Sequence, residues 1–278
     1  MTDISVQQNG TIIDLVGDDN DLSSVSSLEV TNDGVFLNVG EEKVELDTGL
    51  DLSNIDWENT RVIRLGGAPV PHKATGEGFT ITTDNFSNLL ITSCEPEPFD
   101  DVNDGDWFKG DVEEMFNYGF TTGTTATTYS PNESITRAQF AVMLARAFEL
   151  QPTNETNTLT DIGDKWYASE AQALYDAGII KGFNDGTFGG DKELTRQQAM
   201  TMLARMLEHV GVKIEPTKDV HFKDLDKIDK EAQGAVKFLA SMGVLNNGDD
   251  VDFNPYKNLT RAQMAKVVVK SVRLTDLY

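Results

Sequence analysis

Three threonine-arginine pairs, each with a glutamine two residues after the arginine, are the residues of this sequence best suited to binding a ligand. They are Thr136-Arg137, Thr195-Arg196 and Thr260-Arg261. Threonine and glutamine at this spacing form a capping box, in which both side chains satisfy free backbone groups at a helix start. An arginine there lies where backbone N–H groups already attract anions, and its planar guanidinium can hold a carboxylate or phosphate through two hydrogen bonds. We therefore predict anion-binding roles for Arg137, Arg196 and Arg261.

A structural role is the alternative for these arginines. Capping explains the threonine and the glutamine at each predicted helix start, but it gives no reason for the arginine between them. Because the chain is rich in acids, each arginine could pair with an acid of a neighbouring copy of the motif. Both interpretations stay open at the level of the sequence.

Two tryptophans also recur at a fixed position, twelve residues before a glycine: Trp107 before Gly119, and Trp166 before Gly178. An indole ring can stack on the apolar face of a sugar, although large aromatic side chains anchor protein cores as readily. The third copy has Glu231 at this position. The sequence thus predicts sites of unequal strength.

A helical repeat of about 60 residues positions these side chains. Each copy opens with an apolar residue, an acid and an aliphatic residue, followed by a helical pattern that ends at a glycine. An aromatic residue follows ten positions after the glycine, and the threonine of the capping box comes seven positions later. This spacing, identical in all copies, predicts three two-helix units in series. The shared positions are Phe99, Asp101 and Val102, Leu159, Asp161 and Ile162, Phe222, Asp224 and Leu225, the glycines Gly119, Gly178 and Gly243, and the aromatics Tyr129, Phe188 and Phe253.

The first 95 residues have a different pattern, with apolar and polar residues alternating over short stretches. This alternation predicts strands, and Asn32-Asp33-Gly34 is typical of a tight hairpin turn. We expect a small β sandwich or barrel over residues 1–95. Pro96 and Pro98 favour an extended connector, so residues 96–98 are taken as a linker. The strands are expected at 11–16, 27–31, 35–39, 43–46, 61–65 and 79–83.

The net charge of −23, from 46 acidic and 23 basic residues, argues against nucleic acid or an anionic membrane as a partner. No segment approaches the ~20 consecutive apolar residues that span a bilayer, and the first residues lack the pattern of a signal peptide. Either a signal has been removed or export takes another route. With Cys94 as the single cysteine, no intrachain disulfide can form.

No group of residues suited to catalysis or metal binding stands out. The histidines are scattered, Cys94 has no histidine near it, and no phosphate-binding glycine loop follows a strand. The acidic stretch 101–106 resembles a calcium loop, but Val112 stands where such a loop needs a carboxylate. We therefore expect no enzyme activity, no metal and no other cofactor.

The helical region resembles three S-layer homology repeats, at residues 99–150, 159–212 and 222–274. The resemblance rests on the threonine-arginine-alanine signature, here with glutamine in place of the usual final acid, and on the loop Gly182–Phe188. It implies a mostly α-helical, pseudo-threefold trimer of repeats within one chain, and hence an α+β multidomain protein overall. It also implies grooves between repeats that bind a pyruvylated secondary cell-wall polysaccharide. The residues it implies as ligand-binding are Arg137, Arg196, Arg261, Trp107, Trp166, Gly123 and Gly182.

Non-covalent anchoring at the bacterial cell surface is the function that this resemblance predicts, with the cell-wall polysaccharide as partner. The alternative is a structural assembly protein, from a surface array or a phage virion, whose N-terminal β domain docks onto a larger particle. A fragment of a glycan hydrolase is a weaker third hypothesis, because the β-rich region offers no convincing carboxylate pair.

Overall fold

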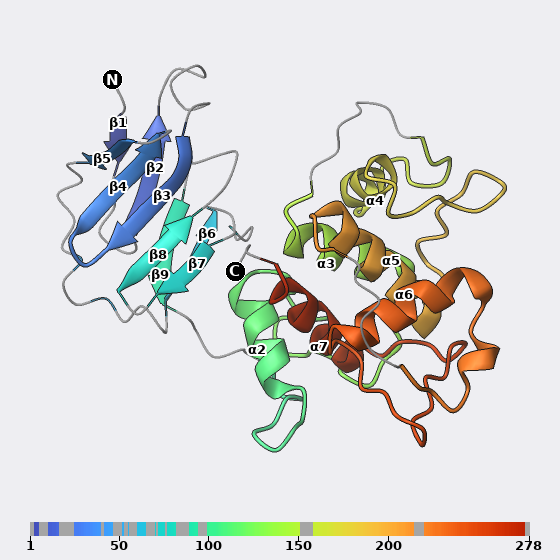
Figure 1. Cartoon of the computed structure of the whole chain (residues 1–278). Coiled ribbons are helices and arrows are strands. Elements are labelled where there is room, and N and C mark those ends of the chain that lie inside the picture. Colours follow the sequence, from blue (N-terminus) through green and yellow to red (C-terminus); the bar gives the residue numbers. More distant parts are fainter. Residues whose placement is uncertain are drawn as a thin grey trace. The chain divides into compact units, whose positions relative to one another are not determined.

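The chain divides into two compact units, which are described separately (Figure 1). One comprises residues 1–97 with the short segments 116–120 and 276–278, and the other comprises residues 98–115 and 121–275. The predicted linker, 96–98, lies outside the described residues. The computed structural model describes residues 3–5, 11–16, 25–39, 42–46, 52, 55, 60–64, 70, 72–75, 77–81, 89–93, 99–150, 158–213 and 220–275.

The N-terminal unit contains two antiparallel sheets. One sheet has four strands in the order β1-β2-β9-β6, and the other has five in the order β5-β4-β3-β8-β7. The strands are β1 (Asp3–Ser5), β2 (Thr11–Val16), β3 (Val25–Thr31), β4 (Gly34–Val39), β5 (Glu42–Leu46), β6 (Thr60–Arg64), β7 (His72–Thr75), β8 (Gly78–Ile81) and β9 (Leu89–Ser93). The six predicted strands are confirmed to within a few residues, whereas β1, β7 and β9 were not predicted.

A single hydrophobic cluster includes residues from both sheets. Leu28 and Val30 on β3 and Phe79 on β8 are buried in it, together with Val62 on β6 and Ile91 on β9. Leu28 and Val30 alternate with the half-buried Glu29, as expected of a strand with one face on a core. The alternation that predicted the strands therefore also selects the side chains that fill the core.

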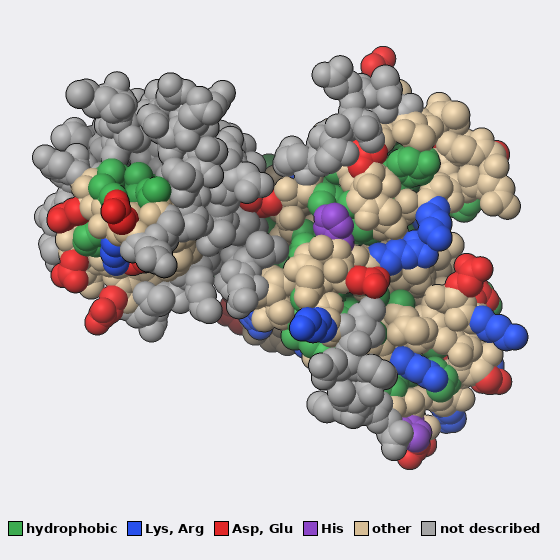
Figure 2. All heavy atoms as spheres, turned by 45° about the horizontal axis from the view of Figure 1, so that its top comes forward, with side chains coloured by type: hydrophobic (Ala, Val, Ile, Leu, Met, Phe, Trp, Pro, Cys, Tyr) green, Lys and Arg blue, Asp and Glu red, His purple; other side chains and the backbone are tan. Residues whose placement is uncertain are grey.

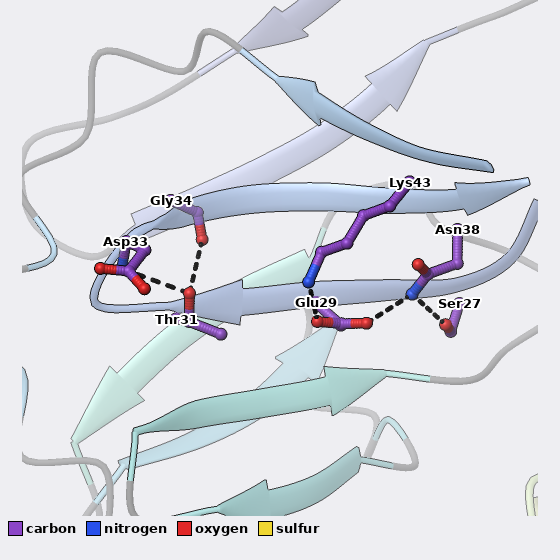
Figure 3. Close-up of polar contacts among 7 residues, drawn as sticks. All are labelled: Ser27, Glu29, Thr31, Asp33, Gly34, Asn38 and Lys43. Carbon is purple, nitrogen blue, oxygen red and sulfur yellow. Dashed lines mark hydrogen bonds and ion pairs between the residues drawn. The ribbon is translucent and has the colours of Figure 1, made fainter.

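The predicted hairpin is present between β3 and β4, where Thr31 pairs with Gly34 across the turn. Gly34 has φ +146°, which glycine adopts without strain. On the outer face, Lys43 Nζ forms an ion pair with Glu29 at 2.6 Å, and Asn38 Nδ2 donates to Glu29 at 2.7 Å (Figure 3). These hydrogen bonds, from Lys43 first and then from Asn38, lower the pKa of Glu29. Core packing on one face and polar contacts on the other thus hold β3, β4 and β5 together.

The second unit is helical, with two α-helices in each predicted repeat. The first helix of each repeat ends just before Gly119, Gly178 or Gly243, whose φ angles of +70°, +72° and +79° allow the chain to leave the helix. None of the described helices is long and apolar enough to cross a membrane. The helices are α2 (Lys109–Asn117), α3 (Arg137–Ala147), α4 (Ala168–Asp176), α5 (Arg196–His209), α6 (Lys230–Ser241) and α7 (Arg261–Val272), with a short 3-10 helix, η2 (Leu225–Lys227).

A closed ring of three backbone hydrogen bonds joins the repeats just before their second helices. Ile135 N–H donates to Leu259 O at 2.9 Å, and Leu259 N–H donates to Leu194 O at 2.9 Å. Leu194 N–H donates to Ile135 O at 3.0 Å, which closes the ring. All three residues are fully buried, and the helices α3, α5 and α7 that follow them contact one another. The equivalent residues of the repeats therefore meet around one centre.

Candidate ligand-binding site

The predicted capping boxes start α3, α5 and α7. Thr136 Oγ1 accepts from Gln139 N–H at 3.2 Å, and Thr260 Oγ1 accepts from Gln263 N–H at 3.3 Å. Each glutamine side chain accepts in return from the threonine N–H. The box is also present at α5, where Gln198 Oε1 accepts from Thr195 N–H at 3.2 Å. There the buried Oγ1 of Thr195 faces the Gln198 N–H without reaching a full hydrogen bond.

This difference predicts unequal costs for removing the three hydroxyl groups. Thr136→Ala and Thr260→Ala should each lower the free energy of unfolding by about 1 kcal/mol, the usual cost of a lost N-cap. Thr195→Ala should cost clearly less, since its hydroxyl faces the Gln198 N–H without a full hydrogen bond. Chemical denaturation of the three variants tests this, and an equal loss for Thr195→Ala would contradict it.

An aspartate near the start of each repeat holds the loop before the second helix. Asp161 Oδ1 accepts from Phe188 N–H at 2.6 Å and Asp161 Oδ2 accepts from Gly189 N–H at 2.8 Å. Asp101 and Asp224 accept in the same way from the residues at the equivalent positions. The sequence shows these acids at a repeated position, but nothing local in it reveals that they bind loop residues 27 to 30 positions away.

The signature arginines join consecutive repeats. Arg137 Nε donates to Phe188 O at 3.1 Å, Arg196 Nε donates to Phe253 O at 2.7 Å, and Arg261 Nε donates to Tyr129 O at 2.6 Å. Each guanidinium also lies over the ring of the same aromatic residue, 4.7 to 5.2 Å from its centroid. Arg261 of the third repeat thus contacts Tyr129 of the first repeat, so the three contacts link all the repeats in a closed cycle.

Among the described residues, none of these arginines forms an ion pair with an acid. Burial lowers the pKa of all three, and nearby groups, including Asp161 for Arg137 and Asp224 for Arg196, partly oppose the shift. The expected structural pairing with a neighbouring repeat exists, but its acceptor is a backbone carbonyl.

The three guanidinium groups differ in what remains accessible. Arg261 is only 2% exposed and its Nη2 is buried without a hydrogen-bond partner. Arg196 is half-buried, and its Nη1 donates to Gln263 Oε1 at 3.2 Å. Arg137 is 8% exposed, packs against Phe183 as well as Phe188, and lines a pocket.

Both predicted tryptophans lie on the surface and not in the core. Trp107 is 57% exposed and Trp166 is 64% exposed. Each contacts the following aromatic residue edge to face, with ring centroids 5.3 Å apart. Lys266 Nζ of the third repeat lies 4.9 Å from the Trp107 ring. The indole faces are thus placed where a sugar could reach them.

The two predicted glycines are required by their loops. Gly123 and Gly182 have φ +79° and +70°, and a Cβ at Gly182 would lie 2.8 Å from Leu159 Cδ2 and 3.0 Å from Thr187 O. A Cβ at Gly123 would meet three atoms within 2.7 Å. Asn247, at the same position in the third repeat, does not have a positive φ. The third loop therefore follows a different backbone path.

A pocket of about 440 Å³ brings together residues of all three repeats. Arg137 comes from the first repeat, the loop containing Lys181 and Gly182 comes from the second, and Glu231 comes from the third. Of the predicted residues, Arg137 and Gly182 thus share one pocket, and Glu231 fills the tryptophan position there. Arg196, Arg261, Trp107, Trp166 and Gly123 do not line this pocket. The Gly182 loop of the second repeat therefore shares this pocket with Arg137 of the first repeat, and not with Arg196 of the second.

Arg205 on α5 also lines the pocket and was not predicted. It donates from Nη1 to Ile179 O at 3.0 Å. A signal for it exists, because Arg146, Arg205 and Lys270 each stand ten residues after a capping threonine. On the face of the helical unit in Figure 2, basic side chains are interspersed with acidic ones. The described residues include no group of three or more side chains suited to holding a metal ion.

Comparison with known proteins identifies the repeats. A family model described as the S-layer homology domain matches residues 98–141, 158–200 and 221–265. The endoglucanase of Bacillus sp. (strain KSM-635) is 34% identical over 172 residues, which are 62% of this chain and 18% of the endoglucanase. The cellulosome-anchoring protein of Acetivibrio thermocellus is 29% identical over 149 residues, 52% of this chain and 33% of that protein.

The surface-layer 125 kDa protein of Lysinibacillus sphaericus is 36% identical over 109 residues, 39% of this chain and 9% of that protein. The chain therefore spans a third or less of the length of each of these relatives. The chain carries three S-layer homology domains in tandem.

Proposed function

We propose that the three S-layer homology domains anchor this protein non-covalently to the bacterial cell surface. Surface-layer and cellulosome-anchoring proteins are among its relatives, which supports this role. The matches to polysaccharide hydrolases cover only 10 to 18% of those enzymes, and we propose that the shared region is non-catalytic. These relatives give no support to the phage virion alternative.

The ligand we propose is a pyruvylated cell-wall polysaccharide, bound in the pocket between the repeats. The observation that carries this proposal is the set of three cationic side chains, Arg137, Lys181 and Arg205, that line one pocket of a chain with net charge −23. They outnumber the two acids of the same pocket, Asp229 and Glu231. The protein as a whole repels a polyanion, so a pocket with three cationic side chains favours a localised anionic group. Arginine forks suit a carboxylate such as that of a pyruvyl ketal.

The finer architecture is part of the same proposal. The closed ring of hydrogen bonds through Ile135, Leu194 and Leu259 supports a pseudo-threefold arrangement of the repeats. The common core of the two sheets supports a β sandwich in the N-terminal domain. We propose that residues 1–95 and 99–278 fold independently and that the β domain faces outward or joins a larger assembly.

Removal of pyruvate from the wall polymer should lower binding of the full chain by at least about tenfold, because the ligand then loses the carboxylate that the cations hold. Co-sedimentation with purified walls, before and after mild acid hydrolysis of the ketals, measures this. Walls carried through the same steps without acid are the control. Unchanged binding to depyruvylated walls would reject the proposed ligand.

A further inference from the structure

The pocket that holds Arg137 also contains an acid without a partner, Glu231. This side chain is exposed, and within the described part of the chain it forms no hydrogen bond or ion pair. The pocket cations Lys181 and Arg205 are likewise free of ion pairs there. Glu231 stands at the position that Trp107 and Trp166 occupy in the other repeats. This pocket therefore has a negative charge where an aromatic ring could otherwise stack on a sugar.

The chain segment that carries Glu231 is fixed by a second change found in the same pocket. Gln197 stands where the other two signature motifs have alanine, and it is buried. Its Nε2 donates to Asp229 Oδ2 at 2.7 Å, and its Oε1 accepts from Asp229 N–H at 3.1 Å. Tyr256 OH donates to Asp229 Oδ1 at 2.7 Å. Asp229 precedes the first residue of α6, and Glu231 is the second. Gln197 and Tyr256 thus fix Asp229, two residues before Glu231 at the start of α6.

An anionic sugar without a positive group would meet the pocket's cations and also the unpaired carboxylate of Glu231. Such a carboxylate would lose hydration without gaining a partner, which weakens binding. A ligand with a protonated amino group beside its anionic group could pair with the cations and with the Glu231 carboxylate at the same time. The first two repeats have Trp107 and Trp166 at the position of Glu231. A ligand there meets no carboxylate at this position and needs no positive group to pair with it.

We infer that the pocket containing Glu231 selects an amino sugar whose amino group is free and protonated, next to an anionic substituent. The ammonium group pairs with Glu231, and the anion pairs with Arg137, Lys181 and Arg205. This inference rests on the proposed function and adds the ligand's charge pattern to it.

Two synthetic probes test the inference: the pyruvyl ketal of a methyl hexosaminide with a free amine, and its N-acetylated form. Calorimetric titration of the full chain at about pH 6 keeps the amine protonated. The free amine should bind about fivefold more tightly, the size of a solvent-exposed charge pair. Glu231→Gln should abolish this preference, and Glu231→Trp should reverse it toward the N-acetylated form. Glu208→Gln, the same change on an exposed residue of α5 outside the pocket, should leave it intact.

Equal affinity for the two probes, with binding still lost on removal of pyruvate, would overturn this inference and leave the proposed function standing. A preference that persists in Glu231→Gln would also overturn it, because another group would then recognise the amine. If neither probe binds, the proposed function and the inference fail together.

Discussion

Arg261→Ala is expected to lower the free energy of unfolding of the helical unit by about 3 kcal/mol. The variant loses the hydrogen bond from Nε to Tyr129 O and the contact with the Tyr129 ring, at a residue that is 2% exposed. A hydrogen bond from a charged group contributes about 1.5 to 3 kcal/mol and a desolvated cation–π contact about 2 kcal/mol, offset in part by the lower cost of burying alanine. Denaturant unfolding of the full chain, followed by helical circular dichroism, measures the loss.

Arg146→Ala is the matched control, since it also removes an arginine from the second helix of a repeat. The ion pair between Arg146 and Glu170 is long, at 4.0 Å, and partly exposed. The expected cost of Arg146→Ala is about 0.5 kcal/mol. Arg261→Lys should recover only part of the stability, because an ammonium group cannot reproduce the planar contact with the ring. Equal costs for Arg261→Ala and Arg146→Ala would show that Arg261 does not join the first and third repeats.

The local signals in the sequence predicted the helical repeats well, because each depends on residues close in sequence. A capping threonine, a helix-ending glycine and a hairpin turn each act over a few residues. The unpredicted strand β9 begins Leu89-Leu90-Ile91, a continuous apolar run without alternation, and it lies between β2 and β6 within its sheet. Such a run is typical of an interior strand but is ambiguous by periodicity alone. The strands β1 and β7 are short and lie at sheet edges.

The roles of the predicted site residues depend on contacts that no local pattern contains. Arg261 and Tyr129 are 132 residues apart, and Arg137 and Phe188 are 51 apart. The sequence predicted that each arginine has a special role at a helix start, and left binding and structural pairing as alternatives. The structure supplies the structural partner and places only Arg137 in the described pocket. Which loop meets which arginine follows from the packing order of the repeats.

Binding in the pocket should depend most strongly on Arg137. Its Nε donates to Phe188 O, while its other nitrogens have no acid partner among the described residues and the side chain lines the pocket. Removing it would leave the ligand carboxylate with Lys181 and Arg205 alone in a strongly acidic protein. The loss of a partner from a desolvated charge pair costs about 2 to 5 kcal/mol, so affinity at this pocket should fall by more than about tenfold.

A stability effect must be separated from the binding effect, because Arg137 also joins two repeats. Thermal unfolding and titration with the soluble pyruvyl-ketal probes, performed on one sample well below its melting temperature, give both quantities. Arg137→Ala should bind weakly even when fully folded, and Arg137→Lys should restore affinity only in part, since a point charge lacks the fork geometry. Arg196→Ala is the matched control, because Arg196 makes the same kind of carbonyl contact without lining this pocket. Wild-type affinity at this pocket in a folded Arg137→Ala sample would mean that the arginine only holds the repeats together.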